Sequence, residues 1–215
     1  MQRILIADDH PLFRQAMREI VTDVFTRRGG PFTCLEAADT EAMFKAAAAP
    51  DELDLVLLDL FMPGSSGLAD LVLLRNRVPA TPIVVVTSLD DTATVQRALA
   101  CGAAGYVVKS ASKDVMIGAL QVVLAGGTYA PSGAVPAQQA PGAAAEDALT
   151  PRQLAVLALL ANGSSNKQIA RDLDIRDVTV KAHMTAILRK LGVATRSQAI
   201  VAFQRDRLGH EQPTL

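Results

Sequence analysis

The chain has 215 residues, of which 50% are apolar, and a formal net charge of −1. This length fits one large or two small domains, and the apolar fraction is sufficient for packed cores. No apolar run reaches the roughly 18 residues needed to span a bilayer, which argues against membrane insertion. The first residues turn acidic at Asp8 and Asp9, too early for a signal peptide, so we expect a cytoplasmic protein that does not bind membranes.

The charge is unevenly distributed along the chain. Residues 1–130 carry 11 Lys and Arg against 15 Asp and Glu, a balance of −4. Residues 148–215 carry 10 against 5, a balance of +5, and Glu146 with Asp147 supplies the remaining −2. This asymmetry predicts that only the C-terminal part binds a polyanion. Cys34 and Cys101 are the only cysteines, and we expect both to be reduced thiols.

Residues 1–127 alternate short apolar runs with helical patterns, which predicts one domain. Strands are expected over 3–8, 32–37, 53–59, 82–87 and 104–109, and helices over 11–27, 39–49, 67–77, 90–101 and 112–125. Asp39, and either Asp90 or Asp91, lie where helix N-caps are needed. The alternation favours right-handed crossovers and an α/β fold with a doubly wound, parallel, five-stranded sheet.

Residues 128–147 are rich in Ala, Pro and Gly and contain almost no large apolar side chains. Such a segment cannot build a core, so it is predicted to be a linker. The alternative for part of it is a short helix near 143–148.

Residues 148–215 contain no strand-like run and predict a small all-α domain of four helices. The first follows Thr150 and Pro151 and ends at Asn162, the second covers about 166–173, the third starts at Asp177 or Thr179 and runs to about Leu191, and the fourth covers 197–204. A helix, a short turn and a longer helix are typical of a helix-turn-helix. The fourth helix could form a symmetric contact or belong to the domain's own core.

Polar side chains follow four of the expected strands at their carboxyl ends: Asp8 and Asp9, Asp59, Thr87 and Lys109. In a parallel sheet these ends meet in one crevice. A carboxylate there can bind a divalent cation or attack phosphorus. Asp8 and Asp9 suit Mg²⁺, while an ammonium and a hydroxyl suit phosphoryl oxygens. Taken singly, each residue has an ordinary interpretation as a loop, cap or surface residue, but their joint placement favours a shared pocket.

These residues resemble the receiver domain of two-component response regulators. The matching stretches are Ile-Ala-Asp8-Asp9-His-Pro, Leu-Leu-Asp59-Leu-Phe-Met-Pro-Gly, Val-Val-Val-Thr87-Ser and Gly-Ala-Ala-Gly-Tyr106-Val-Val-Lys109. The resemblance covers about residues 2–125 and implies a flavodoxin-like fold.

The resemblance also implies roles for single residues. Asp59 would be the phosphoacceptor and Lys109 the partner of the phosphate. Mg²⁺ would be held by Asp8, Asp9, Asp59 and the backbone carbonyl of Phe61. 

Thr87 and Tyr106 would form the switch: Thr87 would move towards the phosphate, and Tyr106 would then turn inward. The alternative for Tyr106 is a half-buried strand residue without a switching role.

One loop departs from the family pattern. The chain reads Ser65-Ser66-Gly67 where the family usually carries an acid before that glycine. We expect little effect on phosphorylation, because the loop is polar either way. His10 is expected to help place Asp9 and not to act as a base.

In the third C-terminal helix, Lys181, Ala182, Thr185 and Arg189 fall opposite the apolar positions. A helix in the major groove presents its N-terminal half to base edges. Lys181 can donate to guanine, Ala182 can touch a thymine methyl group, and Thr185 can contact a base or a phosphate. Residues expected to hold phosphates are Asn166, Lys167, Thr179, Lys190 and Arg196.

Residues 148–205 resemble the LuxR-type DNA-binding domain, on the stretches Leu149-Thr-Pro-Arg-Gln, Asn166-Lys-Gln-Ile-Ala and Val178-Thr-Val-Lys-Ala-His. Joined to a receiver, this domain implies the NarL/FixJ class of response regulators. Family members often carry a valine and a longer polar residue at the sites of Ala182 and Thr185, so the operator sequence stays open.

The leading hypothesis is a DNA-binding transcription factor, switched when a sensor histidine kinase phosphorylates Asp59, and binding double-stranded DNA as a homodimer. It would not be a dedicated enzyme, although it could remove its own phosphate. One alternative is a regulator of the same shape that needs no phosphorylation. Another is an Asp-based phosphatase. Such enzymes usually use a second acid for general acid chemistry, but this chain carries Phe61 at the corresponding place. A Rossmann dehydrogenase is excluded by the missing Gly-x-Gly-x-x-Gly.

Overall fold

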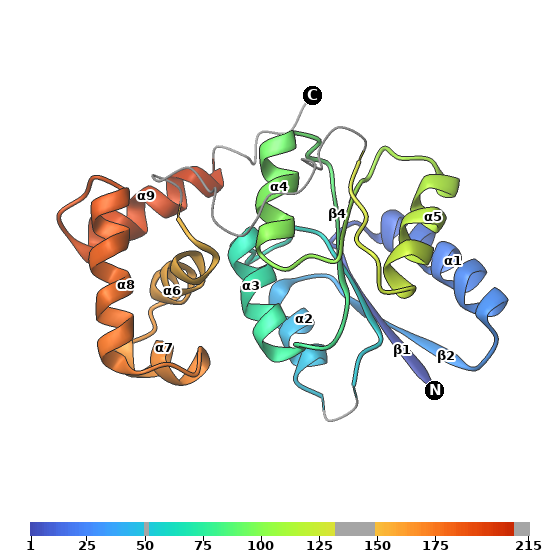
Figure 1. The fold of residues 1–215 in the computed structure, drawn as a ribbon, viewed down its shortest axis with the longest axis horizontal. Coiled ribbons are helices and arrows are strands. Elements are labelled where there is room, and N and C mark those ends of the chain that lie inside the picture. The colour runs from blue at the N-terminus through green and yellow to red at the C-terminus, as the bar shows by residue number, and fades with distance from the viewer. Residues whose placement is uncertain (50–51, 132–148, 209–215) are drawn as a thin grey trace. The chain divides into compact units, whose positions relative to one another are not determined.

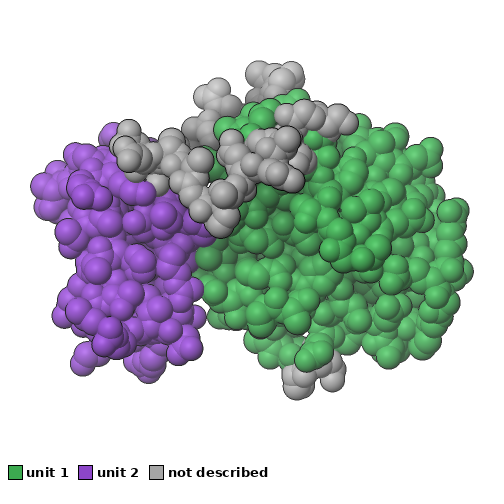
Figure 2. Space-filling view, in the orientation of Figure 1, with its two compact units in different colours: residues 1–137 green, residues 138–215 purple. Residues whose placement is uncertain are grey.

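The computed structural model describes residues 1–49, 52–131 and 149–208. The chain divides into two compact units, residues 1–137 (unit 1) and residues 138–215 (unit 2), which Figure 2 shows in different colours. The alternative helix near 143–148 falls outside the described residues. None of the helices in the described ranges is both long and apolar enough to cross a membrane.

Unit 1 contains a parallel sheet with the strand order β2-β1-β3-β4-β5. Its described strands are β1 (Gln2–Ala7), β2 (Phe32–Ala37), β3 (Leu55–Leu58), β4 (Ile83–Thr87) and β5 (Gly105–Val108). The helices between and after them are α1 (Pro11–Arg28), α2 (Thr40–Ala47), α3 (Leu68–Arg77), α4 (Thr92–Ala100) and α5 (Lys113–Leu124). The predicted doubly wound, flavodoxin-like fold is confirmed, with the order of strands reversing between β1 and β3.

Helices cover both faces of the sheet: α1 and α5 lie on one face, and α2, α3 and α4 on the other (Figure 1). Successive strand residues point to opposite faces, and helices cover both faces, which explains why the central strands β3 and β4 are apolar almost throughout. Buried strand residues that pack with α1 and α5 are Ile4, Ile6, Leu55, Leu57, Val84, Val86 and Val107. Those that alternate with them are Leu5, Val56, Leu58, Val85 and Tyr106, all buried.

The register of the sheet brings the polar strand ends to one edge. Ala7 is level with Leu58 on the neighbouring strand, and Thr87 is level with Val108. The residues that follow, Asp8, Asp59 and Lys109, therefore leave the sheet at the same edge. Backbone hydrogen bonds continue the pairing there, from Asp59 N to Ala7 O at 2.8 Å and from Lys109 N to Thr87 O at 2.8 Å.

Local signals start the helices of unit 1 close to the predicted positions. Asp39 accepts a hydrogen bond from Ala42 N at 2.7 Å, and Asp91 accepts one from Thr94 N at 2.8 Å. Asp91, and not Asp90, is thus the N-cap of α4, which resolves the open alternative. 

The third strand is shorter than the predicted 53–59, because regular strand pairing is confined to Leu55–Leu58 and only single backbone bonds from Asp54 and Asp59 extend it.

All regular elements in the described part of unit 2 are helices: α6 (Pro151–Ala161), α7 (Asn166–Asp172), α8 (Asp177–Lys190) and α9 (Arg196–Leu208). Thr150 and Ser165 each form a capping box, with Gln153 and Gln168 respectively. The predicted start of α8 at Asp177 is confirmed, and the alternative start at Thr179 is wrong. Arg176 occupies the N-cap position without a side-chain cap bond, and Asp177 is the first helical residue, where its negative charge suits the helix dipole.

The core of unit 2 comes mainly from α6, whose apolar residues Leu154, Val156, Leu157 and Leu160 are buried. The expected apolar face of α8 supplies Val180 and Ile187, both 0% exposed. α9 extends beyond the predicted 197–204, and it buries Ala199 and Phe203 within the unit. This burial favours the interpretation that α9 belongs to the domain's own core.

Candidate functional site

Two buried carboxylates share one ammonium group at the carboxyl edge of the sheet. Lys109 Nζ lies 2.7 Å from Asp8 Oδ2 and 2.7 Å from Asp59 Oδ2. Both aspartates are almost wholly buried, at 2% and 3% exposure. The ammonium also lies 4.8 Å from the centroid of the Phe13 ring, a cation–π contact that the sequence analysis missed. Three residues from separate strand ends are thus brought together as expected.

Asp9 joins Asp8 and Asp59 in an acidic cluster, and His10 lies beside these three carboxylates. One potential ligand atom from each of the four lies within 4.8 Å of the others. His10 Nδ1 is 2.7 Å from Asp9 Oδ1, while the backbone N–H of His10 donates to Asp8 Oδ1 at 2.8 Å. Carboxylate oxygens are the ligands that Mg²⁺ prefers, so this donor set fits such an ion. His10 contacts Asp9, in agreement with the expected placing role.

Burial and pairing act in opposite directions on these groups. Burial raises the pKa of Asp59 above its usual value, although the nearby Lys109 ammonium opposes this effect. Burial alone would lower the pKa of Lys109, but the two carboxylates together raise it. The pocket therefore holds a firmly protonated lysine beside an acid whose negative charge is costly, an arrangement that a second cation would relieve.

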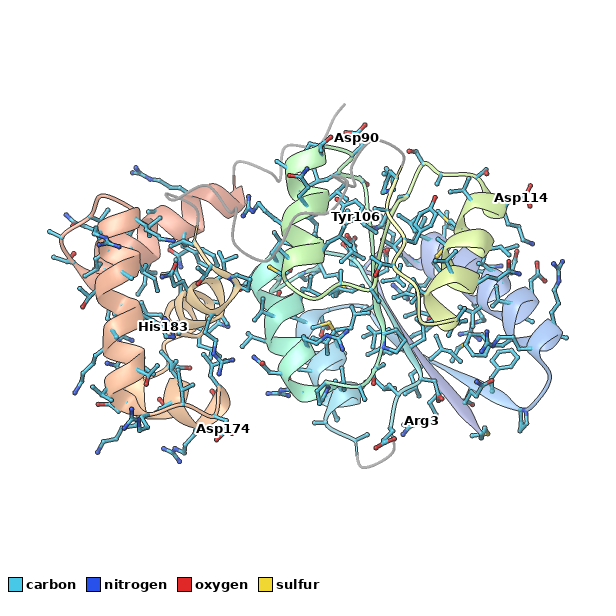
Figure 3. The ribbon with its side chains drawn as sticks, viewed as in Figure 1. Arg3, Asp90, Tyr106, Asp114, Asp174 and His183 are labelled. Atoms are coloured by element: carbon cyan, nitrogen blue, oxygen red, sulfur yellow. The ribbon has the colours of Figure 1, made fainter. Side chains whose placement is uncertain are left out.

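Thr87 and Tyr106 lie on neighbouring strands, and both side chains are 0% exposed. Thr87 Oγ1 has no hydrogen-bond partner among the residues that the structure describes, which is uncommon for a buried hydroxyl. The hydroxyl of Tyr106 donates to the backbone carbonyl of Leu89 at 2.9 Å, and Figure 3 labels this residue. The ring of Tyr106 is already buried in this structure, more deeply than the half-buried alternative expected. Its switching role stays a prediction.

The loop after Asp59 is held by its own polar groups. The backbone N–H of Phe61 donates to Asp59 Oδ1 at 3.2 Å. Ser65 Oγ lies 2.9 Å from Asp70 Oδ2, and the backbone N–H of Ser66 donates to the same oxygen. Asp70, on α3 and 4% exposed, thus supplies a carboxylate to the loop in which the family's usual acid is missing. The sequence analysis did not identify this residue, although Asp70 is the only acid between Asp59 and Asp90.

In unit 2, the residues predicted to contact bases lie together on one side of α8. Lys181, Ala182, Thr185 and Arg189 are all exposed. Lys181 Nζ pairs with Asp177 Oδ2 at 2.8 Å, four residues earlier on the same helix. The Thr185 hydroxyl donates to the backbone carbonyl of Lys181 at 3.2 Å.

The residues predicted to hold phosphates are less uniform. Lys167 and Arg196 are exposed, while Asn166, Thr179 and Lys190 are partly buried. Arg196 Nη2 donates to the Ser164 carbonyl at 2.8 Å, and its Nη1 lies 3.4 Å from Asn166 Oδ1. The loop before α7 and the start of α9 are therefore joined through Arg196.

Two family models match the chain. Residues 4–121 match the response regulator receiver domain, and residues 147–203 match the bacterial regulatory proteins of the LuxR family. The chain is a LuxR-type response regulator. Members of this family receive signals from sensor kinases and bind DNA, and they are not dedicated enzymes.

Known proteins resemble this regulator over nearly its whole length. The glycerol metabolism activator of Pseudomonas putida is 42% identical, with 94% of this chain and 95% of the relative covered. The nitrate/nitrite response regulator protein NarL of Escherichia coli K12 is 33% identical, with 95% and 96% covered. The crystal structure of a LuxR-family two-component response regulator from Aurantimonas is 29% identical, covers 60% of this chain and 88% of its own, and superimposes with a TM-score of 0.52. The predicted NarL/FixJ resemblance is confirmed.

Proposed function

We propose that this regulator is switched by transfer of a phosphoryl group from a sensor histidine kinase to Asp59, and that the phosphorylated form binds double-stranded DNA as a homodimer. The observation that carries the proposal is the sharing of the Lys109 ammonium by Asp8 and Asp59, each at 2.7 Å. A structural ion pair would need one carboxylate. The second carboxylate leaves negative charge suited to a metal and a nucleophile in one buried pocket.

The transfer step requires a nucleophilic oxygen and a leaving group. A carboxylate oxygen of Asp59 attacks phosphorus, the phosphorus–nitrogen bond of the kinase's phosphohistidine breaks, and the imidazole leaves with a proton. The Lys109 ammonium then pairs with one phosphoryl oxygen, and the unpartnered hydroxyl of Thr87 donates a hydrogen bond to another. Water can later hydrolyse the acyl phosphate in the same pocket and restore Asp59.

Mg²⁺ suits the acidic cluster, with Asp8, Asp9, Asp59 and the backbone carbonyl of Phe61 as the residues that would hold it. When bound, such an ion neutralises the charge of the phosphoryl oxygens. The chain's own contribution is to fix the carboxylate oxygens that would hold the ion: the His10 N–H orients Asp8, and the Phe61 N–H orients Asp59.

The switch begins from a buried Tyr106. Because the ring is already inward and bonded to the Leu89 carbonyl, the signal is a change in the loop that carries Leu89 and in the N-terminus of α4, and not the entry of the ring. Movement of Thr87 towards the phosphate would bias this loop between two arrangements.

The DNA-binding part of the proposal rests on the exposed face of α8. Lys181, Ala182 and Thr185 would face bases, while Arg189 and the residues at 166, 167, 179 and 190 would contact phosphates. We propose the functional boundaries as a receiver over 1–127, a linker over 128–147 and a DNA-binding domain over 148–215. A cytoplasmic location follows from a DNA target and a kinase donor.

The test uses the full-length regulator with acetyl phosphate and Mg²⁺. Intact mass spectrometry should show one added phosphoryl group on the unchanged protein and none on Asp59→Asn. The matched control is Asp114→Asn, which removes a carboxylate from the exposed start of α5 and should be phosphorylated normally. Phosphorylation should also raise the affinity for a selected DNA duplex and the fraction of dimer.

The outcomes separate the alternatives. A mass gain on Asp59→Asn would show that another residue is the acceptor. DNA binding that is unchanged by phosphorylation would favour a regulator that works without it. Steady turnover of an organic phosphate monoester would favour a phosphatase.

A further inference from the structure

An exposed valine lies in the first turn of α8, on the outer face of the helix. Val178 is 59% exposed, although it follows the first residue of a helix whose outer surface is otherwise mainly polar or charged. With about 100° between successive residues, Val178 and Thr185 fall opposite the buried Val180 and Ile187. Val178 is not among the residues predicted for this face, which include Lys181, Ala182 and Thr185.

The side chains beside Val178 add methyl groups to this face. Ala182 is exposed one turn further along the helix. Thr185 follows after almost another turn, and its hydroxyl donates to the Lys181 carbonyl at 3.2 Å. Because that hydroxyl hydrogen is used within the helix, the methyl group is the part of Thr185 without a hydrogen-bonding role. Val178, Ala182 and Thr185 together form a face that we call the methyl stripe.

Cations border the methyl stripe. Lys181 is exposed at its edge, with its ammonium drawn towards Asp177 at 2.8 Å, and Arg189 is exposed further along the helix. An apolar stripe beside exposed cations on a basic unit suits a polyanion that also presents apolar groups. The major groove of DNA is such a surface, because every thymine projects a C5-methyl group into it.

We infer that the methyl stripe reads thymine methyl groups, and that Val178 is a specificity-determining residue of this regulator. The inference rests on the proposed DNA-binding function and deepens it: the preferred half-site carries thymines whose methyl groups meet α8. Lys181 supplies the polar contact beside them.

The experiment has two stages and uses the full-length, acetyl phosphate-treated protein. Binding sites are first selected from a pool of random duplexes. Each thymine of the selected half-site is then replaced singly by deoxyuridine, which keeps the base pair and lacks only the methyl group. At one or more positions, the loss should weaken binding by about fourfold, the scale expected for one buried methyl group.

The decisive variant is Val178→Ser, which should remove the deoxyuridine effect at one position while the other sensitive positions stay sensitive. Its matched control is Val201→Ser, because Val201 is a 48% exposed valine on α9. This control should keep the position-by-position pattern of the unchanged protein. Thermal unfolding of both variants checks that the fold is retained.

Two results would overturn this inference and leave the proposed DNA-binding function intact. One is binding that tolerates deoxyuridine at every position, and the other is a Val178→Ser variant with the same deoxyuridine-sensitive positions as the unchanged protein. A Val178→Ser variant that alters only self-association would assign the valine to a protein contact instead. A pool that yields no bound DNA would overturn the proposed DNA-binding function itself.

Discussion

Arg14 holds Asp8 through its backbone: Nη1 of the guanidinium donates a 2.8 Å hydrogen bond to the carbonyl oxygen of Asp8. The Nε of the same side chain lies 3.2 Å from Glu36 Oε2, on β2. Arg18 also pairs with Glu36, but the structure records no contact between Arg18 and Asp8. The loop that carries the acidic pair is thereby fixed to both α1 and β2, and Arg14 is a positioning residue for the pocket.

Replacing Arg14 with Ala should raise the Mg²⁺ concentration that phosphorylation requires. Losing the bond to the Asp8 carbonyl costs about 1 kcal/mol, so the Mg²⁺ concentration for half-maximal phosphorylation should rise roughly fivefold. Phosphorylation by acetyl phosphate at several Mg²⁺ concentrations, followed by intact mass, measures this. Arg18→Ala is the matched control, since it also loses Glu36, and it should leave the Mg²⁺ dependence nearly unchanged. Equal effects of the two variants would argue against a role for the carbonyl contact.

Replacing Lys109 with Met should destabilise unit 1 by about 3 kcal/mol, because it leaves two buried carboxylates without their cation. Both tyrosines, Tyr106 and Tyr129, lie in unit 1 and Trp is absent, so tyrosine fluorescence during urea unfolding reports this unit. Lys113→Met is the control. Lys113 pairs with Asp23 at 2.7 Å on the exposed surface, where a salt bridge contributes little to stability. If the two variants lost similar amounts of unfolding free energy, the buried Lys109 ammonium would contribute no more to stability than the exposed Lys113.

The fold and the gathering of the acids could be predicted from sequence, because both depend on local patterns. Apolar runs and helix caps predict the strand–helix order, and a parallel sheet then brings Asp8, Asp59 and Lys109 to one edge. The contacts of Arg14 and Asp70 could not be predicted in this way. They depend on which rotamers long or buried side chains adopt across elements that are distant in sequence.

Two further differences have local causes. Arg176 was not expected as an N-cap, because arginine supplies no capping acceptor, and the helix begins there without one. Tyr106 was expected to start outside. The structure buries its ring and gives its hydroxyl the Leu89 carbonyl, a backbone acceptor that no side-chain pattern marks.

Replacing Asp174 with glycine should raise the stability of unit 2, and replacing it with valine should lower that stability. It lies in the turn between α7 and α8 with φ 49°, a left-handed conformation that L-residues adopt at a cost. Asp174→Gly should raise the stability of unit 2 by up to about 1 kcal/mol, and Asp174→Val should lower it by roughly 1–3 kcal/mol. Thermal unfolding followed by circular dichroism measures both. A stable Asp174→Val variant would contradict the strain.

The stability of unit 2 should fall in mild acid because of His183. Burial, and then the positive charge of Arg152, lower the pKa of this imidazole in the folded state. Below the unfolded value of about 6.5, the unfolded chain binds a proton more readily than the folded one, so stability is lost as pH falls through the lowered folded pKa. Above about 6.5 both states are neutral, and the effect disappears.

Replacing His183 with Gln should flatten this pH dependence, as measured by thermal midpoints at several pH values. His10→Gln serves as the control, because His10 is a 68% exposed side chain in unit 1. If His183→Gln and the unchanged protein lost stability in parallel below pH of about 6.5, another group would be responsible.

The carboxylate of Asp70 also constrains how this chain can evolve. An aspartate substituted at Ser66, where relatives usually carry an acid, would meet a neighbouring carboxylate that is already buried and bonded to the Ser66 N–H. Two like charges in so small a space repel each other. An acid at position 66 is therefore compatible with this loop only if position 70 changes as well, so positions 66 and 70 should covary among relatives of this chain.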